Sequence, residues 1–474
     1  MSPIIDIHCH TFNADDLPVR GFVQKVAFHD HPFTDGVAQL VDLVIQGAAP
    51  GYRDEIRRLD ELLAPTGGPE AAQVPLTAAQ LEAEVDLAFA DLARSAPELL
   101  RQVGYAMADV PEPDPAATTT AEGFFDWVDS ARRAVRWAKL FGKQRIDLTV
   151  ALLSNFDNRI DLYTPLTVDL GMGLEDTAKT TIREQLELHE KISRLSMMDR
   201  LPGGVRGHVH GFVGFDPRRE LRARRTGDIE LPLSVVRSAI EDYGMIGVKL
   251  YPPMGFRPLG NAAAPAVPDG ADLDGILGEL YTWCVDADVP ITAHCNDSNY
   301  AHESFQDFAS PDNWAPALAA FPGLRVNLGH FGGARASEQP DGWPWKAAAL
   351  TADHPTVFAD VGNHKIHDDE IRTAYFSMLA AMFAQPSTAT MTERLMFGSD
   401  WYMLANHEDH DRFLDEYEGH YRDAFGDALT DAFLGENALR FLGLDDPANQ
   451  NHQRLLARYE RFAPDNVPGW LGSP

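Results

Sequence analysis

The chain begins with Pro3-Ile4-Ile5-Asp6-Ile7-His8-Cys9-His10-Thr11-Phe12, a short apolar run that leads directly into two histidines. This run predicts a buried strand of the parallel type over residues 3–7. Side chains two positions apart on a strand point to the same face, so His8 and His10 should project together from its far end. Paired imidazoles in such a place suit a divalent metal ion.

Seven further strands are predicted along the chain, and helical segments separate most of them. Repeated strand–helix alternation of this kind is the pattern of a (β/α)8 TIM barrel. A doubly wound sheet would require a glycine-rich phosphate loop after the first strand, and the sequence has none there. The eight predicted strands are residues 3–7, 146–153, 208–215, 246–250, 289–293, 324–328, 356–361 and 395–397.

A long segment after the first strand stands outside this alternation. Helical periodicity marks residues 51–64, 78–104 and 123–142, whereas residues 109–121 read as an exposed loop. An amphipathic helix must bury its apolar face, so we expect this segment to be a lid or the contact surface of a homodimer. The expected division is residues 1–12 for the first barrel strand, 13–145 for a mostly helical insertion, 146–445 for the remaining barrel and 446–474 for a C-terminal tail.

The charge balance limits the classes of partner. Asp and Glu outnumber Lys and Arg by 71 to 40, which gives a net charge of −31 and a surface that repels nucleic acid and anionic membranes. No apolar run is long enough to span a membrane, and no signal peptide opens the chain, so cytoplasmic residence is expected. Three cysteines without a CxxC pair exclude a disulfide framework. A small molecule is the expected substrate, and an anionic one would need cations inside the site.

Polar residues that could carry chemistry follow the apolar part of several predicted strands. The active sites of TIM barrels lie at the C-terminal ends of the strands, so these residues should converge. Two other HxH pairs lack this context. His29 and His31 lie in a predicted loop, and His208 and His210 precede the apolar part of their strand, which indicates a structural role at the opposite mouth. The residues at the C-terminal strand ends are His8, His10, Lys249, His294, His330 and Asp400.

Several motifs together resemble the amidohydrolase superfamily, in its amidohydrolase-related branch, which is similar to aminocarboxymuconate-semialdehyde decarboxylase. The resemblance covers the first twelve residues and residues 205–443, whereas residues 13–145 match nothing known to us. The motifs that carry it are IIDIHCHTF, GFVGFDPR, GVKLYPP, ITAHCND, VNLGHFGG, MFGSDW and GENALRFLGL.

The resemblance implies roles for the residues at the strand ends. His8, His10 and His294 would be metal ligands, and Asp400 would be the carboxylate ligand that also moves protons. His330 would contact the substrate, or bind a second metal in relatives with two metals.

Lys249 stands where some relatives with two metals carry a carboxylated lysine. Whether it is carboxylated, or is a plain ammonium that pairs with Asp400 or a substrate carboxylate, stays open. Residues that flank the strand ends and could bind substrate are Tyr251, Arg257, Asn296 and Trp401.

The chemistry of this residue set points to the same kind of site. Three imidazoles and one carboxylate with an open position describe a catalytic Zn²⁺-type site, with Mn or Fe as alternatives. Such a metal lowers the pKa of bound water towards ~7, so that hydroxide can attack a carbonyl. We therefore expect a hydrolase of a small-molecule amide, lactone or related carbonyl bond. The alternative is a metal-dependent non-oxidative decarboxylase of an aromatic or enoic acid.

Overall fold

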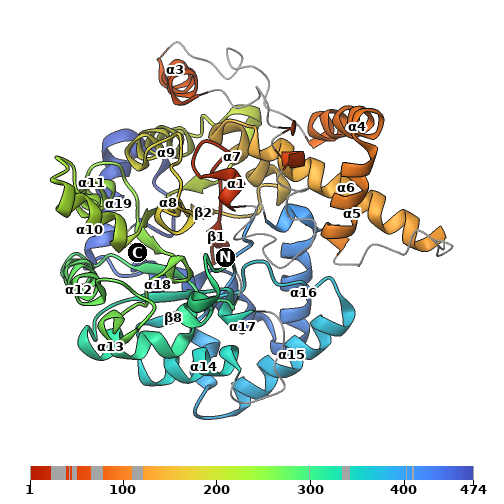
Figure 1. The fold of residues 1–474 in the computed structure, drawn as a ribbon. Helices are drawn as coiled ribbons and strands as arrows, with labels where there is room; N and C mark the ends of the chain where they lie inside the picture. The colour runs from red at the N-terminus through yellow and green to blue at the C-terminus, as the bar shows by residue number, and fades with distance from the viewer. Residues whose placement is uncertain are drawn as a thin grey trace.

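Parallel strands at the centre of the molecule are surrounded by helices (Figure 1). This computed structural model describes residues 2–22, 39–41, 43–44, 51–65, 78–108, 121–297, 299–333, 342–401, 403–407 and 410–472. His29 and His31 lie outside the described residues, and so do residues 109–120 of the loop predicted at 109–121. The prediction of an α/β protein built on parallel strands is confirmed.

The strands form two parallel sheets, ordered β1-β2-β3 and β4-β5-β6-β7-β8-β9. Isolated bridges connect the two sheets at two places: Leu166, which follows the middle strand of the first sheet, pairs with Phe212, and Cys9 pairs with Trp401. The strands are β1 (Ile5–Cys9), β2 (Leu162–Pro165), β3 (His208–Val209), β4 (Phe212–Phe215), β5 (Gly247–Leu250), β6 (Ile291–His294), β7 (Val326–Gly329), β8 (Val357–Asp360) and β9 (Leu395–Met396).

The strand predicted at 146–153 is wrong, because these residues belong to helix α7 (Arg145–Asn155). The helix is apolar on most sides, and seven of its residues are buried, so its sequence lacks the polar stripe that marks a surface helix. A short apolar run of this kind does not distinguish a buried strand from a buried helix. The strand that pairs with β1 is β2, in which Leu162 lies beside Ile5 and Tyr163 beside Asp6.

The helices predicted at 51–64, 78–104 and 123–142 are present, with their ends moved by a few residues, and the second is divided in two. Thr181 and Glu184 form a capping box that starts α9, which lies over β3. Among the described residues, no helix is long and apolar enough to cross a membrane. The α-helices are α1 (Val19–Phe22), α3 (Tyr52–Leu63), α4 (Ala78–Ser95), α5 (Pro97–Ala108), α6 (Ala121–Phe141), α7, α8 (Gly171–Leu174), α9 (Ile182–Met197), α10 (Pro217–Thr226), α11 (Pro232–Glu241), α12 (Gly270–Asp286), α13 (Ala315–Ala320), α14 (Trp343–Asp353), α15 (Asp369–Ala384), α16 (Phe413–Phe425), α17 (Asp427–Asp431), α18 (Asn437–Leu442) and α19 (Gln450–Phe462).

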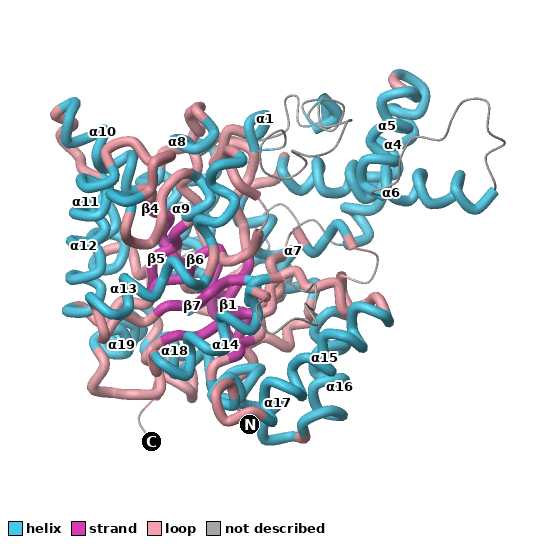
Figure 2. The backbone as a smooth tube through the Cα atoms, turned by 60° about the horizontal axis from the view of Figure 1, so that its bottom comes forward, coloured by secondary structure: helices cyan, strands magenta, loops and turns pink. Residues whose placement is uncertain are grey.

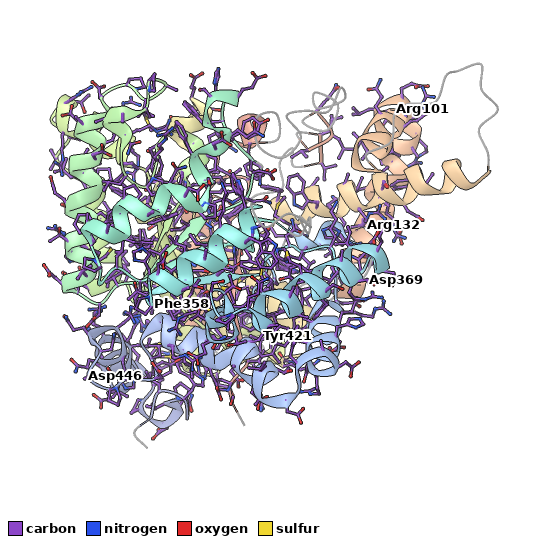
Figure 3. All side chains as sticks on the ribbon, turned by 90° about the horizontal axis from the view of Figure 1, so that it is seen from below. Arg101, Arg132, Phe358, Asp369, Tyr421 and Asp446 are labelled. Atoms are coloured by element: carbon purple, nitrogen blue, oxygen red, sulfur yellow. The ribbon has the colours of Figure 1, made fainter. Side chains whose placement is uncertain are left out.

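Helices α4, α5 and α6 project to one side of the strands (Figure 2), and in Figure 3 Arg101 marks α5 and Arg132 marks α6.

A buried ion cluster joins helix α3 to α7 and to the segment after β1. The guanidinium of Arg145 donates to both carboxylate oxygens of Asp16 and, at 2.7 Å, to Glu55 on α3. Burial raises the pKa of Glu55, although Arg145 opposes that shift. The cluster therefore joins three segments that are distant in sequence.

The segment predicted as a C-terminal tail contains α19, whose Leu455 and Tyr459 are buried. The hydroxyl of Tyr459 lies 2.7 Å from His208 Nδ1 and 3.0 Å from His210 Nε2. The second nitrogen of His210 contacts Ser193 Oγ at 3.1 Å. This HxH pair therefore holds α19 and α9 against β3, as expected of a structural pair.

Candidate metal centre

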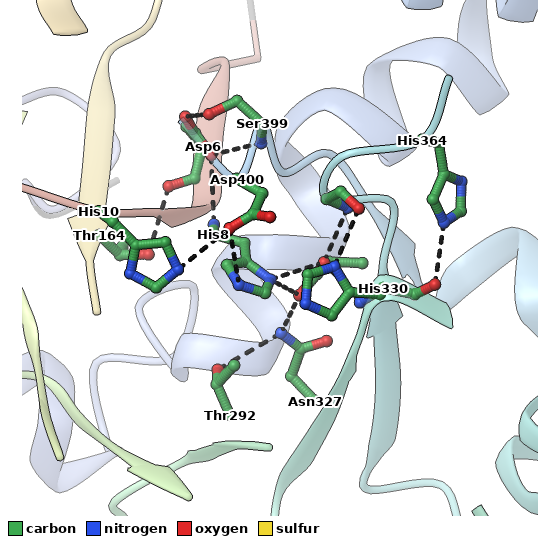
Figure 4. A network of polar contacts seen from close by, with 12 residues as sticks. Asp6, His8, His10, Thr164, Thr292, Asn327, His330, His364, Ser399 and Asp400 are labelled. Carbon is green, nitrogen blue, oxygen red and sulfur yellow. Dashed lines mark hydrogen bonds and ion pairs between the residues drawn. The ribbon is translucent and has the colours of Figure 1, made fainter. Parts of the chain in front are cut away.

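Three buried side chains from opposite ends of the chain meet beside the end of β1. His8 and His10 come from β1 and the residue after it, and Asp400 comes from the loop after β9. One ligand atom from each of the three lies within 4.8 Å of the others. His10 Nε2 is 3.0 Å and His8 Nε2 is 3.7 Å from the same oxygen of Asp400. Figure 4 shows this group, with His330 on the other side of His8.

The hydrogen bonds of the two imidazoles determine which nitrogens face Asp400. His8 Nδ1 lies 2.9 and 3.0 Å from the two oxygens of Asp360, and His10 Nδ1 lies 2.9 Å from the carbonyl of Leu166. These partners only accept hydrogen bonds, so each Nδ1 carries the hydrogen and each Nε2 of a neutral ring does not. Two nitrogen lone pairs then face a carboxylate, an arrangement that a cation between them would stabilise.

Two electrostatic features of this group favour metal binding. Burial lowers the pKa of His8 to about 4, with Asp360 opposing the shift, so its ring is neutral at pH 7. Burial opposes ionisation of Asp400, but the close approach of His10 and the other nearby histidines outweighs it and lowers the pKa. His8 Nε2 is buried, and no described residue forms a hydrogen bond with it. Neutral imidazole and ionised carboxylate are the forms that ligate a metal, so the residues fit a divalent ion.

Asp360, at the end of β8, organises the site, and it was missed in the sequence. Besides His8 Nδ1 it accepts hydrogen bonds from the backbone N–H of His330 at 3.1 Å and of Gly362 at 3.0 Å. The side-chain amide of Asn327 donates to it at 2.7 Å. Burial opposes its ionisation, but His8 and these donors lower its pKa far below the usual range. The signal in the sequence that could have identified Asp360 was its position, because it is a carboxylate at the end of an apolar strand, as His294 is the last residue of β6.

His294 and His330 continue the row of rings along the strand ends. The ring centre of His330 lies 4.6 Å from that of His8 and 4.7 Å from that of His294. His330 Nδ1 is 3.0 Å from the carbonyl of Gly362, which orients the ring. His294 lies outside the group of three that share one 4.8 Å neighbourhood. Tyr251 stacks on its other side, with ring centres 4.4 Å apart and planes at 17°.

Lys249 on β5 is buried inside the strands, with 2 % of its surface exposed. It pairs in register with Gly214 on β4 and Thr292 on β6. Its ammonium lies 5.8 Å from the ring centre of Tyr251. Burial lowers the pKa of Lys249 to about 8, and Asp360 and Asp400 oppose that shift. A group with this pKa is still mostly protonated at pH 7.

The close packing around His8 requires glycine and unusual backbone conformations. A Cβ added at Gly398 would lie 2.8 Å from the Cβ of His8. His330, Asn363 and Asp400 have φ values of 68°, 58° and 54°, which non-glycine residues rarely adopt. Strain of this kind persists where surrounding contacts over-determine the backbone, and it concentrates at functional sites.

A second buried carboxylate, Asp6, holds β1 against the loop that carries Asp400. It accepts the backbone N–H of Ser399 at 2.9 Å and its hydroxyl at 2.6 Å, and also the N–H of His8 at 3.2 Å. Burial raises the pKa of Asp6 to about 7, although its hydrogen bonds with Ser399 oppose the shift. This contact therefore joins β1 to that loop through backbone N–H groups and a hydroxyl, without a bond to an imidazole.

Three other residues, Trp401, Asn296 and Arg257, were predicted to bind substrate. Trp401 is buried, and its backbone N–H donates to Ser399 Oγ at 2.9 Å. Asn296 accepts the N–H of the next residue at 2.8 Å, beside Gly333. Arg257 lies over the ring of Phe308 at 5.2 Å in the loop after β5. None of the hydrogen bonds of Arg257 and Asn296 found among the described residues reaches His8, His10 or Asp400.

Comparison with known proteins shows which family the chain resembles. A family model described as amidohydrolase matches residues 196–444, just over half of the chain. No curated protein sequence matches the chain.

Several solved structures are similar to the chain at low sequence identity. An amidohydrolase from Burkholderia multivorans with bound zinc is 15% identical over 62% of this chain and 87% of its own, with a TM-score of 0.38. Dihydroorotase from Saccharomyces cerevisiae in complex with 5-fluoroorotic acid is 10% identical over 64% of this chain and 82% of its own, with a TM-score of 0.39. Sequence identities and TM-scores this low do not assign a family, so the family assignment rests on residues 196–444, which the family model matches.

Proposed function

This chain belongs to the amidohydrolase family, and from that membership we propose that it is a metal-dependent hydrolase of an amide, lactone or related carbonyl bond in a small molecule. The observation that carries the proposal is the convergence of His8, His10 and Asp400 within 4.8 Å. The hydrogen bonds of both imidazoles leave their Nε2 lone pairs directed at this group.

The proposed ligands are His8, His10, His294 and Asp400, with Zn²⁺ as the proposed ion. His294 is the last residue of β6, and its ring lies beside that of His330. This position supports its inclusion among the proposed metal ligands. When bound, the ion supplies Lewis acidity, which activates water and polarises a carbonyl.

Asp400 and His330 are the proposed groups that handle protons and charge. Asp400 is ionised and lies beside His10, so its free oxygen can accept a proton from water and later deliver it to the leaving group. His330 Nδ1 is committed to the carbonyl of Gly362, so a protonated ring would present Nε2–H to a developing oxyanion. Tyr251, Asn296, Arg257 and Trp401 remain proposed as the lining of the substrate site.

We also propose that the two sheets close into one eight-stranded barrel that carries a helical insertion after β1. The bridges between Leu166 and Phe212 and between Cys9 and Trp401 join the two sheets at two places, which supports closure. The projection of α4 to α6 away from the strands supports an insertion that acts as a lid or a homodimer surface. Deletion of this segment should change either the oligomeric mass in solution or the choice of substrate.

The test combines metal analysis with matched histidine variants. Purified protein should contain stoichiometric metal, lose hydrolysis of a panel of amides and lactones on chelation, and regain it with Zn²⁺. His10→Asn should lose the metal, whereas His208→Asn, in the other HxH pair, should keep it. Protein that contains no metal, and whose activity is unchanged in Asp400→Asn, would refute the proposal. Release of CO₂ from aromatic or enoic acids, without hydrolysis of the panel, would instead assign a decarboxylase.

A further inference from the structure

A buried cation beside the proposed metal centre has no carboxylate in contact with it among the described residues. Lys249 is 2 % exposed, and the described part of the chain offers its ammonium no hydrogen bond or ion pair within 4 Å, only longer-range charge interactions. Long charged side chains are rarely buried without a partner, because removal of the charge from water is costly. The net charge of the chain is −31, so a carboxylate partner would have been easy to provide.

The two carboxylates that interact electrostatically with the ammonium already have other partners. Asp360 and Asp400 both act on Lys249 electrostatically, since both oppose the effect of its burial. Asp360 accepts hydrogen bonds from four groups, including both His8 and His330. Asp400 faces the two imidazoles of the proposed metal ligands. Neither carboxylate contacts the ammonium, which therefore keeps its hydrogen-bond donors for another partner.

The rings around Lys249 place it beside the reaction centre. Its ammonium lies 5.8 Å from the ring centre of Tyr251, and that ring stacks at 4.4 Å on His294. His294 lies 4.7 Å from His330, which in turn lies 4.6 Å from His8. An anion held by Lys249 would thus be next to the groups that are proposed to act on a carbonyl.

We propose that Lys249 binds a carboxylate of the substrate, so that the substrates are small carboxylic acids whose scissile carbonyl bond lies close to the acid group. This inference rests on the proposed hydrolase function. An ammonium is a compact charge with three donors, which suits a carboxylate in a confined interior. In an acidic protein that otherwise repels anions, an internal cation with no carboxylate in contact selects for them.

The test measures ligand binding rather than turnover. The probes are benzoate and benzamide, which have similar shapes and differ in charge, titrated into full-length protein with Zn²⁺ and after removal of the metal. A charged hydrogen-bonded pair changes affinity by about tenfold to a hundredfold. Wild type should prefer benzoate by that factor in both forms, and Lys249→Met should reduce the preference to within about twofold. Lys249→Arg, which keeps the charge, should retain it.

A matched control and a carbon label complete the experiment. Lys365→Met removes an exposed lysine from the loop after β8 and should leave benzoate binding unchanged. Thermal unfolding and metal content should show that both methionine variants are folded and loaded. Equal affinity of wild type and Lys249→Met for benzoate, including no binding by either, would overturn the proposal. So would a ¹³C carbamate signal from labelled bicarbonate that disappears in Lys249→Met, because a carboxylated lysine is itself an anion.

The outcomes separate this inference from the proposed function. If benzoate preference depends on Lys249 but no amide or lactone is cleaved, the hydrolase proposal fails and the carboxylate site stands. If neutral amides or lactones are cleaved and the preference is absent, the carboxylate site fails and the hydrolase proposal stands.

Discussion

Replacement of Asp360 by asparagine should weaken metal binding although residue 360 is not among the proposed ligands. The carboxylate holds the Nδ1–H of His8 at 2.9 and 3.0 Å, and that bond keeps the Nε2 lone pair directed at Asp400. The introduced amide can donate to Nδ1 instead. The hydrogen of the His8 ring would then move to Nε2, the atom that must ligate the metal without a hydrogen.

The magnitude follows from the contacts of Asp360. Loss of a carboxylate that orients a ligand histidine typically lowers metal affinity 10- to 100-fold, or about 1.4–2.8 kcal/mol. The metal-free protein should also lose about 2–4 kcal/mol of unfolding free energy, because buried bonds from Asn327, His330 and Gly362 lose a charged acceptor.

Chelator competition measures the metal affinity of Asp360→Asn, and urea unfolding of stripped protein measures its stability. Asp6→Asn is the matched control, because Asp6 is an equally buried carboxylate that binds Ser399 and the backbone of His8 but no imidazole. We expect both variants to lose stability and only Asp360→Asn to lose at least tenfold in metal affinity. Wild-type affinity in Asp360→Asn, or an equal loss in Asp6→Asn, would refute the role given to Asp360.

Three further outcomes are expected elsewhere in the fold. Arg145→Met should cost about 3–5 kcal/mol in urea unfolding, because two carboxylates stay buried without their partner. Burial lowers the pKa of His189 to about 3, so this one histidine should contribute a fall in unfolding free energy of about 1.4 kcal/mol per pH unit below pH 6.5, as only the unfolded chain binds the proton. His189→Leu should reduce the total slope by that amount between pH 6.5 and 5, and an unchanged slope would assign it to other groups. Gly398→Ala should push against His8 and weaken metal binding in chelator competition, whereas Gly419→Ala, which has open space around it in α16, should leave affinity unchanged.

The α/β fold and the meeting of His8, His10 and Asp400 were predictable because their signals are local. Each of these residues follows an apolar run, and parallel strands bring their C-terminal ends to one edge. The misassigned strand at 146–153 had an equally strong local signal, but burial on most sides of α7 gives a helix the same apolar composition as a buried strand. Local pattern therefore decides which residues enter the core more reliably than it decides their secondary structure.

The sequence by itself determined the residue types at the strand ends, and with them the metal chemistry that His8, His10 and Asp400 can support. Only the tertiary structure decided which groups support those residues. Asp360 meets His8 across 352 positions, and no spacing along the chain encodes a hydrogen bond formed by strand packing. Among the described residues, the absence of a carboxylate in contact with Lys249 is likewise visible only when the nearby carboxylates are seen to be engaged. Local sequence specifies chemistry, whereas partners depend on the packing of distant strands.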